Sequence, residues 1–182
     1  MSIDKLYRVR YNEIKNDYTI CYRVRCFFKE EKKMKKSLTV DMIETFLYAV
    51  DDAFPVPLSK KQNLKYYAVK LFSSATICAE IQNGNIISMV AGYTETLSDD
   101  IAYIAVVATL NEAKGRGFAS NCVKEFIEVC RQKSIPAVHL YTSSTNEPAK
   151  AMYKKIGFVT YFPEKEPRPQ DTHFIYKILK ES

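Results

Sequence analysis

A long apolar run, followed by a glycine-containing loop, a helical pattern and a second apolar run, constrains the fold of this chain most strongly. Residues 101–110 are continuously apolar, which is typical of a strand covered on both faces. Apolar positions then recur at helical spacing over residues 117–133, and another strand is predicted at 137–142. A strand, helix and strand in this order place two parallel strands side by side through a right-handed connection. The sheet therefore contains a parallel pair.

Two shorter apolar segments predict an antiparallel hairpin before this unit. Residues 76–81 and 86–91 flank an Asn83-Gly84 pair, which supplies the positive φ angles of a tight turn. With the strand at 101–110 they form three antiparallel strands in chain order. The predicted fold is α/β, or α+β, with a mixed, mostly antiparallel central sheet and helices on both faces.

Two helices are predicted before the hairpin, and the first residues of the chain are less informative. Thr39 suits an N-cap, and apolar residues follow it at helical spacing until Pro55 and Pro57 end the pattern. A second helix is predicted from about Lys60 to Phe72. Alternating residues within 1–28 favour strands, whose register and partners do not follow from the sequence.

The length and the composition predict one domain that spans residues 1–182, with its motif-bearing core at about 76–158. No run of eighteen apolar residues occurs, and the first residues lack the apolar stretch of a secretory signal. We therefore expect a cytoplasmic protein with no membrane partner. The five cysteines are odd in number and form no Cys-x-x-Cys pair, so we expect reduced thiols and no metal site. Cys122 and Cys130 lie on the apolar stripe of a predicted helix, where inert burial is expected.

The net charge of +6 suits nucleic acid, an anionic membrane surface or a phosphorylated cofactor. Much of this excess lies in residues 29–36, where no aromatic residue or glycine interrupts the charges. A solvated turn explains that segment better than a nucleic-acid surface does. We therefore expect no nucleic-acid partner.

Residues 114–119, Lys-Gly-Arg-Gly-Phe-Ala, form a glycine-containing loop that opens onto the N-terminus of a predicted helix. Backbone N–H groups and the helix dipole at such a terminus can cradle a pyrophosphate, and glycine lets the backbone approach closely. Lys114 and Arg116 add positive charge. An ordinary glycine-bearing turn is the alternative for this loop alone.

Residues 146–158 predict a short capped helix with a tyrosine on one face. Asn146 suits the N-cap, and Gly157 suits the position just after the helix. Ala149 lies one turn before Tyr153 on the same face, which leaves space for a ligand beside the tyrosine hydroxyl. A plain core tyrosine would produce the same pattern.

Together, and about thirty residues apart, these two segments resemble the GCN5-related N-acetyltransferases, the GNAT superfamily. The family's phosphate loop reads Arg or Gln, two residues, Gly, one residue, then Gly or Ala, and this chain has Lys114, Gly117 and Ala119 there. Only the first position differs from the family pattern. The lysine there keeps the charge of arginine but lacks its planar guanidinium group. The resemblance covers residues 76–158 and implies the acyl-CoA N-acyltransferase (GNAT) fold.

The resemblance implies that acetyl-CoA is the cosubstrate, that no metal is required, and that an acetyl group moves by direct attack of an amine in a ternary complex. Backbone groups would hold the cosubstrate. Its pantetheine arm would be aligned by the backbone of Val107, Ala108 and Thr109. Its pyrophosphate would be held by the backbone of Gly115, Arg116, Gly117, Phe118, Ala119 and Ser120. Asn146 would lie near the pantetheine arm, and Tyr153 would protonate the departing CoA thiolate. A tyrosine of ordinary pKa, about 10, stays protonated at pH 7 and can make that donation. A backbone N–H on the central strand would polarise the acetyl carbonyl.

The general base is not identified by the resemblance. Some family members use a glutamate on the central strand, where this chain has Tyr103. A phenol is a poor base at neutral pH, so either water relays the proton to another group or the acceptor arrives neutral. Glu95 is a candidate for the base or for an acceptor anchor. We expect His139 to be a packed or solvent-edge residue and His173 to lie on a late strand away from the motifs.

The acceptor site in this family is built from the first helices, their connecting loop and the late strands. The matching segments here are residues 54–59 and 163–171, which either wall a pocket or fix the packing of the helices. A primary amine on a small molecule is the expected acceptor. The alternatives are a protein or peptide amine, or a non-catalytic CoA-binding or partner-binding module. A monomer and a homodimer are both compatible with the sequence.

Overall fold

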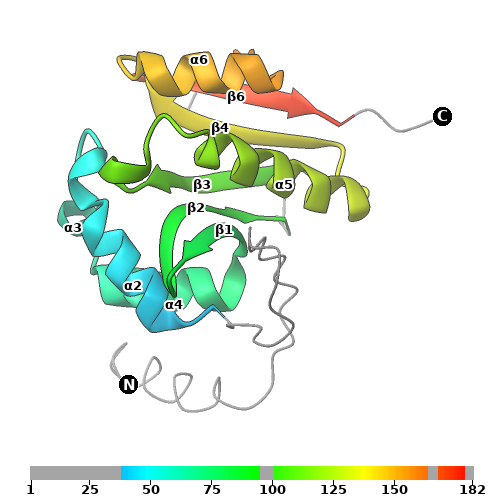
Figure 1. The fold of residues 1–182 in the computed structure, drawn as a ribbon. Helices are drawn as coiled ribbons and strands as arrows, with labels where there is room; N and C mark the ends of the chain where they lie inside the picture. The colour runs from blue at the N-terminus through cyan, green and yellow to red at the C-terminus, as the bar shows by residue number, and fades with distance from the viewer. Residues whose placement is uncertain (1–37, 95–100, 164–167, 179–182) are drawn as a thin grey trace, which may run out of the picture.

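A six-stranded mixed sheet forms the centre of the computed structural model, which describes residues 38–94, 101–163 and 168–178 (Figure 1). The strands follow the order β1-β2-β3-β4-β6-β5. Their bounds are Thr76–Gln82 (β1), Asn85–Tyr93 (β2), Ala102–Thr109 (β3), Ala137–Ser143 (β4), Val159–Thr160 (β5) and Asp171–Lys177 (β6). Neighbouring strands are antiparallel except β3 and β4, which run parallel. The predicted mixed, mostly antiparallel sheet is confirmed.

Helices cover both faces of the sheet, as predicted. Their bounds are Val40–Ala49 (α2), Leu58–Lys61 (α3), Leu64–Ser74 (α4), Phe118–Gln132 (α5) and Glu147–Ile156 (α6), with 3-10 turns at Asp51–Ala53 and Asn111–Ala113. Helices α2 and α4 pack on one face of β1–β3, where Phe46, Leu71 and Met89 are buried together. Helices α5 and α6 lie on the other face (Figure 1), where Phe126 and Phe174 belong to a second core. Burial of each such side chain contributes about 1.5–3 kcal/mol.

The local signals behind the hairpin and the first helix are visible in the structure. Asn83 and Gly84 have φ angles of 50° and 81°, the positive values that a tight turn between β1 and β2 requires. The Thr39 side chain accepts a hydrogen bond from the Met42 N–H at 3.2 Å and so caps α2. Both predictions are confirmed.

The second predicted helix, residues 60–72, is two helices in the structure. The short α3 ends at Lys61, and Gln62 adopts an extended conformation with φ −163°. The Asn63 side chain then accepts a hydrogen bond from the Tyr66 N–H at 3.1 Å, which starts α4 at Leu64. Apolar spacing alone does not reveal this interruption, because the side-chain cap of Asn63 competes locally with a continuous helix.

Strand β3 contains a bulge at the point where its pairing with β4 ends. Ala91 of β2 pairs with Val106, but Gly92 pairs with Ile104, so the register passes over Ala105. The parallel pairing of β3 with β4 covers Ala102 to Ile104 and ends just before this residue. Bulges bend the strand that carries the extra residue. Beyond Ala105 the two parallel strands therefore diverge.

Three cysteines of the described part are buried free thiols, as expected for Cys122 and Cys130; the third is Cys78. Burial raises the pKa of Cys122 to about 11 and the pKa of Cys130 to about 12, so both stay protonated at neutral pH. Within the described ranges, no group of three or more His, Cys, Asp or Glu residues could hold a metal ion. No helix in those ranges is long and apolar enough to cross a membrane.

Several predictions fall on residues outside the described ranges. These are the strands within residues 1–28, the charged turn at 29–36 and the candidate base Glu95. They stay predictions.

Candidate active site

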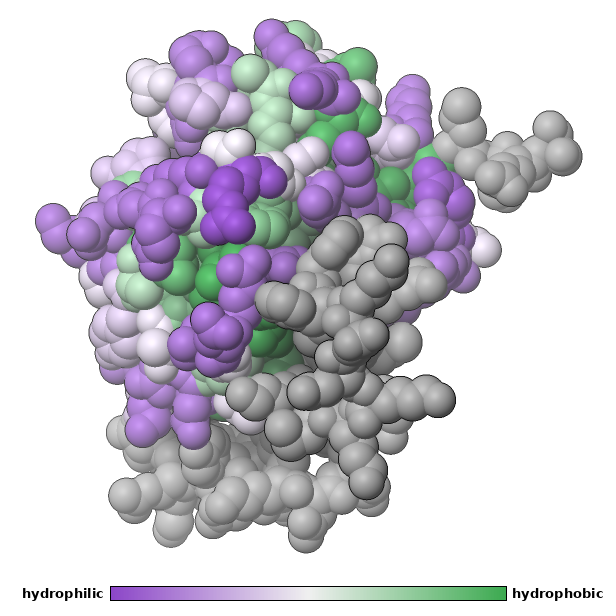
Figure 2. Space-filling view, viewed as in Figure 1, coloured by the Kyte–Doolittle hydropathy of each residue, from purple (hydrophilic) through white to green (hydrophobic). Residues whose placement is uncertain are grey.

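A cleft of about 940 Å³ lies where β3 and β4 diverge. Its lining comes from the loop before α3, from β3, from the glycine loop with the start of α5, from the end of β4, from α6 and from the segment before β6. Ala105, over which the register of β3 passes, is among the lining residues. In Figure 2 hydrophilic residues cover most of the face seen, and hydrophobic residues show between them near its centre. The volume falls within the range of small-molecule sites, about 300–1,000 Å³.

The end of β3 forms one wall of the cleft through Val107, Ala108 and Thr109. Buried hydrogen bonds fix this wall, because the hydroxyl of Ser88 lies 2.8 Å from that of Thr109 and donates to the Ala108 carbonyl at 3.2 Å. Ser88 is fully buried on β2 and is a positioning residue that the sequence analysis did not identify. Its one signal was a polar residue inside an apolar strand.

The glycine loop presents open backbone toward the cleft. Gly115 and Gly117 have φ angles of 75° and 82°, which L side chains rarely adopt, and a Cβ at either would meet no heavy atom within 4 Å. Gly117 is the N-cap of α5, and no described side chain caps that helix. The cleft is lined here by Lys114, Gly115, Gly117, Phe118, Ala119 and Ser120. Uncapped N–H groups at a helix N-terminus suit phosphate oxygens, so this loop fits the predicted pyrophosphate contact.

Arg116 is the one predicted loop residue that does not line the cleft. Its guanidinium lies 4.8 Å from the centre of the Phe118 ring, in a cation–π arrangement. Lys114 lines the cleft. The structure therefore brings one of the two predicted cationic side chains to the cleft.

Helix α6 begins and ends as predicted and carries Asn146 and Tyr153 to the cleft. The Asn146 side-chain oxygen accepts a hydrogen bond from the Ala149 N–H at 3.2 Å, so it caps the helix. Gly157 follows the helix with φ 112°. These local signals fix the position of Tyr153 one turn before the end of α6.

Tyr153 lines the cleft, although it is only 4% exposed. Its ring packs 5.7 Å from the rings of Phe158 and Phe174. Desolvation by burial raises the pKa of Tyr153 well above its usual value of 10. The hydroxyl therefore keeps its proton throughout the neutral and mildly alkaline range.

Both predicted acceptor segments contribute to the lining of the same cleft. Phe54, Pro55 and Val56 come from the first segment, and Arg168, Gln170 and Asp171 from the second. Arg168 and Asp171 form an ion pair, and the Arg168 guanidinium lies 4.8 Å from the centre of the Tyr141 ring. The cleft thus has an apolar wall and a charged wall at this end.

Tyr103, the residue at the family's glutamate position, lines the cleft together with Tyr141. His173 lies on the late strand β6, as expected, and is not among the residues that line the cleft. Strand β6 pairs with β4, and the two imidazoles of His139 and His173 are in direct contact. This pairing joins segments that are distant along the chain, so short-range patterns do not reveal it.

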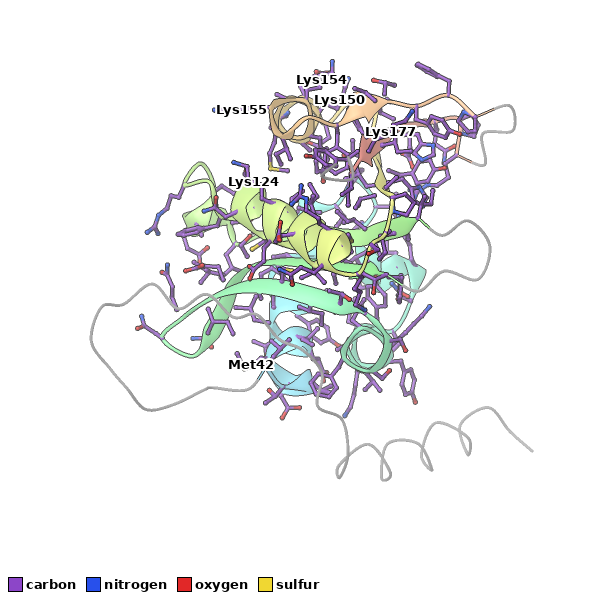
Figure 3. The ribbon with its side chains drawn as sticks, turned by 90° about the vertical axis from the view of Figure 1, so that its right-hand side faces the viewer. Met42, Lys124, Lys150, Lys154, Lys155 and Lys177 are labelled. Atoms are coloured by element: carbon purple, nitrogen blue, oxygen red, sulfur yellow. The ribbon has the colours of Figure 1, made fainter. Side chains whose placement is uncertain are left out.

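A basic surface lies on the same side of the sheet as α6. Figure 3 labels its lysines, which lie away from Met42 of α2: Lys124 on α5, and Lys150, Lys154 and Lys155 on α6. Lys150 is engaged locally, since its ammonium group contacts the Glu147 carboxylate at 2.7 Å. A positive surface of this kind attracts polyanionic molecules by its field.

Comparisons with known proteins identify the family of this chain. Residues 43–158, more than half of the chain, match the family model described as the acetyltransferase (GNAT) family. The chain is also 30% identical over 59 residues to N-alpha-acetyltransferase 30 of Schizosaccharomyces pombe, a match that covers 32% of this chain. The chain spans about two fifths, 39%, of the length of that curated relative.

Two solved structures illustrate the likeness of the fold. Ard1 from Thermoplasma volcanium is 18% identical with a TM-score of 0.64, covering 80% of this chain and 97% of that chain. An aminoglycoside 6'-N-acetyltransferase complexed with coenzyme A is 8% identical with a TM-score of 0.62, covering 79% and 92%. At these identities the likeness shows the fold.

Proposed function

The chain belongs to the GNAT family of acetyltransferases, and from that premise we propose that it transfers an acetyl group from acetyl-CoA to the primary amine of a small molecule. The observation that carries the proposal is the cleft between the diverging strands β3 and β4. One end of it presents the uncapped backbone of the glycine loop, and Tyr153 lines it farther along. Such a site can hold a phosphorylated cosubstrate while a protonated phenol faces the reaction.

Each wall of the cleft has its own part in this proposal. Acetyl-CoA, when bound, supplies the acetyl group as a thioester that an amine can attack directly. The backbone of Val107, Ala108 and Thr109 aligns the pantetheine arm, and the backbone from Gly115 to Ser120 holds the pyrophosphate. Asn146 holds the start of α6 beside the pantetheine arm.

Tyr153 is proposed as the acid that protonates the departing sulfur. Because burial raises the pKa of Tyr153, the hydroxyl is fully protonated when the reaction begins. The rings of Phe158 and Phe174 exclude water from one side of it, which keeps the donated proton within the site. Glu95 lies outside the described residues, and its role as a base stays a prediction.

The acceptor would bind between the apolar wall at Phe54, Pro55 and Val56 and the charged wall at Arg168 and Asp171. An apolar wall opposite a few charged groups is typical of small-molecule sites, where the polar groups fix orientation. Asp171 can attract an ammonium group, and its ion pair with Arg168 limits that attraction. We therefore infer an acceptor that carries both an amine and an apolar portion.

The test is a calorimetric titration with acetyl-CoA and CoA, followed by a screen of small amines for release of the CoA thiol. Saturable binding of both molecules and thiol release with at least one small amine would support the proposal. CoA binding with no thiol release on any amine would indicate a non-catalytic CoA-binding module. No binding of either molecule would favour a partner-binding module of the same fold.

A peptide amine is the second candidate acceptor, and the match to N-alpha-acetyltransferase 30 favours it. The two candidates are separated by matched acceptors, an amino-acid amide and a tetrapeptide that begins with the same residue. A kcat/KM at least about tenfold higher for the tetrapeptide corresponds to about 1.4 kcal/mol of additional transition-state binding. That result would replace the small-molecule proposal with the peptide one.

A further inference from the structure

The chain contains two histidines, and the fold brings them together although they are 34 residues apart. Nδ1 of His139 on β4 lies 3.0 Å from Nε2 of His173 on β6. His173 is only 6% exposed, while His139 is of intermediate exposure, so the contact is part-buried. The two side chains form one imidazole pair, defined here as the His139–His173 pair.

Two tyrosines separate the His139–His173 pair from the cleft. The ring of Tyr103 lies 5.0 Å from that of His139, and the ring of Tyr141 stacks on His173 at 4.2 Å with an angle of 24°. Both tyrosines line the cleft. The pair therefore lies one ring behind the wall at which the acceptor would bind.

The opposite side of the pair faces the surface through a third tyrosine. The ring centres of Tyr161 and His173 lie 5.1 Å apart in an edge-to-face arrangement, and Tyr161 is 42% exposed. A path of adjacent polar rings thus runs from the cleft through both histidines to the outside.

The charged and titratable groups around this path come from several elements. Described residues that face it are Tyr93 on β2, Tyr103 on β3, Tyr141 on β4, Tyr161 after β5, Arg168 before β6, and Asp171 on β6. The Arg168 guanidinium lies 4.8 Å from the centre of the Tyr141 ring and forms an ion pair with Asp171. The two charges of that ion pair offset each other beside the path.

We propose that the His139–His173 pair receives, through the hydroxyl of Tyr103, the proton that an ammonium acceptor loses in the cleft, an inference that rests on the proposed function. One N–H bond of the ammonium breaks and its electron pair stays on nitrogen. The tyrosine oxygen accepts that proton as it gives its own to an imidazole nitrogen. The amine then forms the C–N bond to the acetyl carbon, and the C–S bond breaks. The nitrogen loses a second proton when the C–N bond has formed, and this proton restores the hydroxyl of Tyr153, which has given its own proton to the sulfur. One proton in total therefore leaves through the pair.

Two hydrogen-bonded imidazoles are suited to take up one proton. A hydrogen bond between two ring nitrogens needs one donor and one acceptor, which both the neutral and the singly protonated pair provide. A second proton would make both facing nitrogens donors and break the contact. The pair should therefore titrate as one coupled unit. Once the pair has taken one proton from solvent, it can no longer accept the proton that the acceptor loses. The kcat/KM should rise with pH about tenfold per unit below the apparent pKa of the pair and then level off.

The coupling is measured first, by following the two histidine ring signals with NMR as the pH changes, in the protein with CoA. The variant H139N assigns the signals, because it leaves a single histidine. We expect both signals of the unaltered protein to report the same two steps, and the remaining signal of H139N to show one step at a shifted midpoint. Independent titration of the two signals, with an unchanged midpoint in the variant, would overturn the proposal. This measurement needs no acceptor and no turnover.

The role in transfer is measured by the pH dependence of kcat/KM in H139N and H139Q. We expect a loss of about a hundredfold at pH 7, the lower end of general acid–base effects, that shrinks to within about threefold at pH 9.5. Affinity for CoA should stay within about twofold. Tyr48→Phe is the control, since Tyr48 is an exposed residue of α2 outside the cleft, and its pH profile should match that of the unaltered protein.

The outcomes separate this inference from the proposed function. An equal loss at every pH would assign His139 a merely structural role and overturn the inference. Failure of the unaltered protein to bind CoA or release thiol would instead contradict the proposed function, while the NMR result would still decide whether the histidines share a proton. If H139N and H139Q lose the fold, H173N provides the same pH comparison.

Discussion

Tyr153 combines burial with a position on the cleft wall. Replacing it with phenylalanine keeps the ring that packs on Phe158 and Phe174 and removes only the hydroxyl. We expect kcat to fall by about 10²–10⁴-fold, as for loss of a general acid, while the affinity for acetyl-CoA changes less than about twofold. Steady-state kinetics and calorimetry measure the two quantities. An equal loss in both would assign Tyr153 to binding rather than to proton transfer.

The same burial gives Tyr153 an effect on stability at high pH. Its pKa is raised in the folded protein above the unfolded value of 10, so its contribution is fully present below pH 10 and is lost as the pH rises through the raised value. Burial raises the pKa of Tyr67 in the same direction. We expect the free energy of unfolding to decline above pH 10, and to decline less steeply in Tyr153→Phe. Denaturant titrations at a series of pH values measure both slopes, and identical slopes would contradict the prediction.

Residues whose roles depend on neighbours in sequence were predicted well. Thr39, Asn146 and Gly157 cap or end helices through groups within a few residues, and the structure shows those contacts. Ser88 and His173 act through strands that pair across the sheet. A single sequence contains no direct record of such pairing, because register is set by the packing of the whole sheet.

At the scale of elements, the start of α5 is the part of the cleft most exposed to a change of charge. Gly117→Asp introduces a carboxylate beside the proposed pyrophosphate site, and Gly117→Asn adds a similar side chain without the charge. Like charges about 4 Å apart repel by about 4 kcal/mol at an effective dielectric constant of about 20. We therefore expect CoA to bind at least about a hundredfold more weakly to the aspartate variant than to the asparagine variant, as measured by calorimetry.

Backbone strain should be nearly the same in both Gly117 variants, because the φ of 82° penalises any side chain and Asn and Asp tolerate it best. Their thermal midpoints should therefore agree closely. Equal CoA affinities of the two variants would move the phosphate site away from this helix.

The cap of α6 provides a second test at the scale of elements. Asn146→Ala removes the acceptor of the Ala149 N–H and should cost about 1 kcal/mol of unfolding free energy. Asn146→Asp keeps an acceptor and places a negative charge at a helix N-terminus, so it should retain the stability. For a chain of this size the alanine change lowers the melting temperature by about 2–4 °C. Equal melting temperatures for the two variants would contradict the cap.

Order and type of the elements were predicted from periodicity, while their interruptions were not. The hairpin, the parallel crossover and α6 each have a strong local signal in the turn or cap residues. Gln62 and Asn63 divide the second predicted helix, and the apolar positions on either side continue the same spacing. The bulge at Ala105 likewise has no signal in a strand that is apolar throughout.

At the scale of the whole molecule, the sheet is shared by both cores. Strand β2 contributes Met89 to the core under α2 and α4 and Val90 to the core under α5. Loss of either core would expose the other through the same strands, which supports the prediction of one domain. We expect one cooperative transition, with far-ultraviolet circular dichroism and tyrosine fluorescence giving the same midpoint. Two separated midpoints would contradict the single domain.

Gly92 connects the two cores at the bulge. A Cβ added there would lie 2.6 Å from Cζ of Phe126 and 2.6 Å from the carbonyl oxygen of Tyr103. Gly92→Ala should therefore cost about 1–3 kcal/mol through overpacking. Adding Phe126→Leu should recover only the part due to the ring, as a double-mutant cycle measures. Full recovery would show that the backbone of Tyr103 is not strained by the substitution.

The extra residue at Ala105 makes the cleft depend on how many residues β3 contains, more than on which residues they are. Substitutions along this strand would change the lining and leave the opening in place. Deletion of Ala105 would restore regular pairing with β2 and remove the bend that separates β3 from β4. The segment from Ala102 to the glycine loop should therefore tolerate changes of composition far better than insertions or deletions.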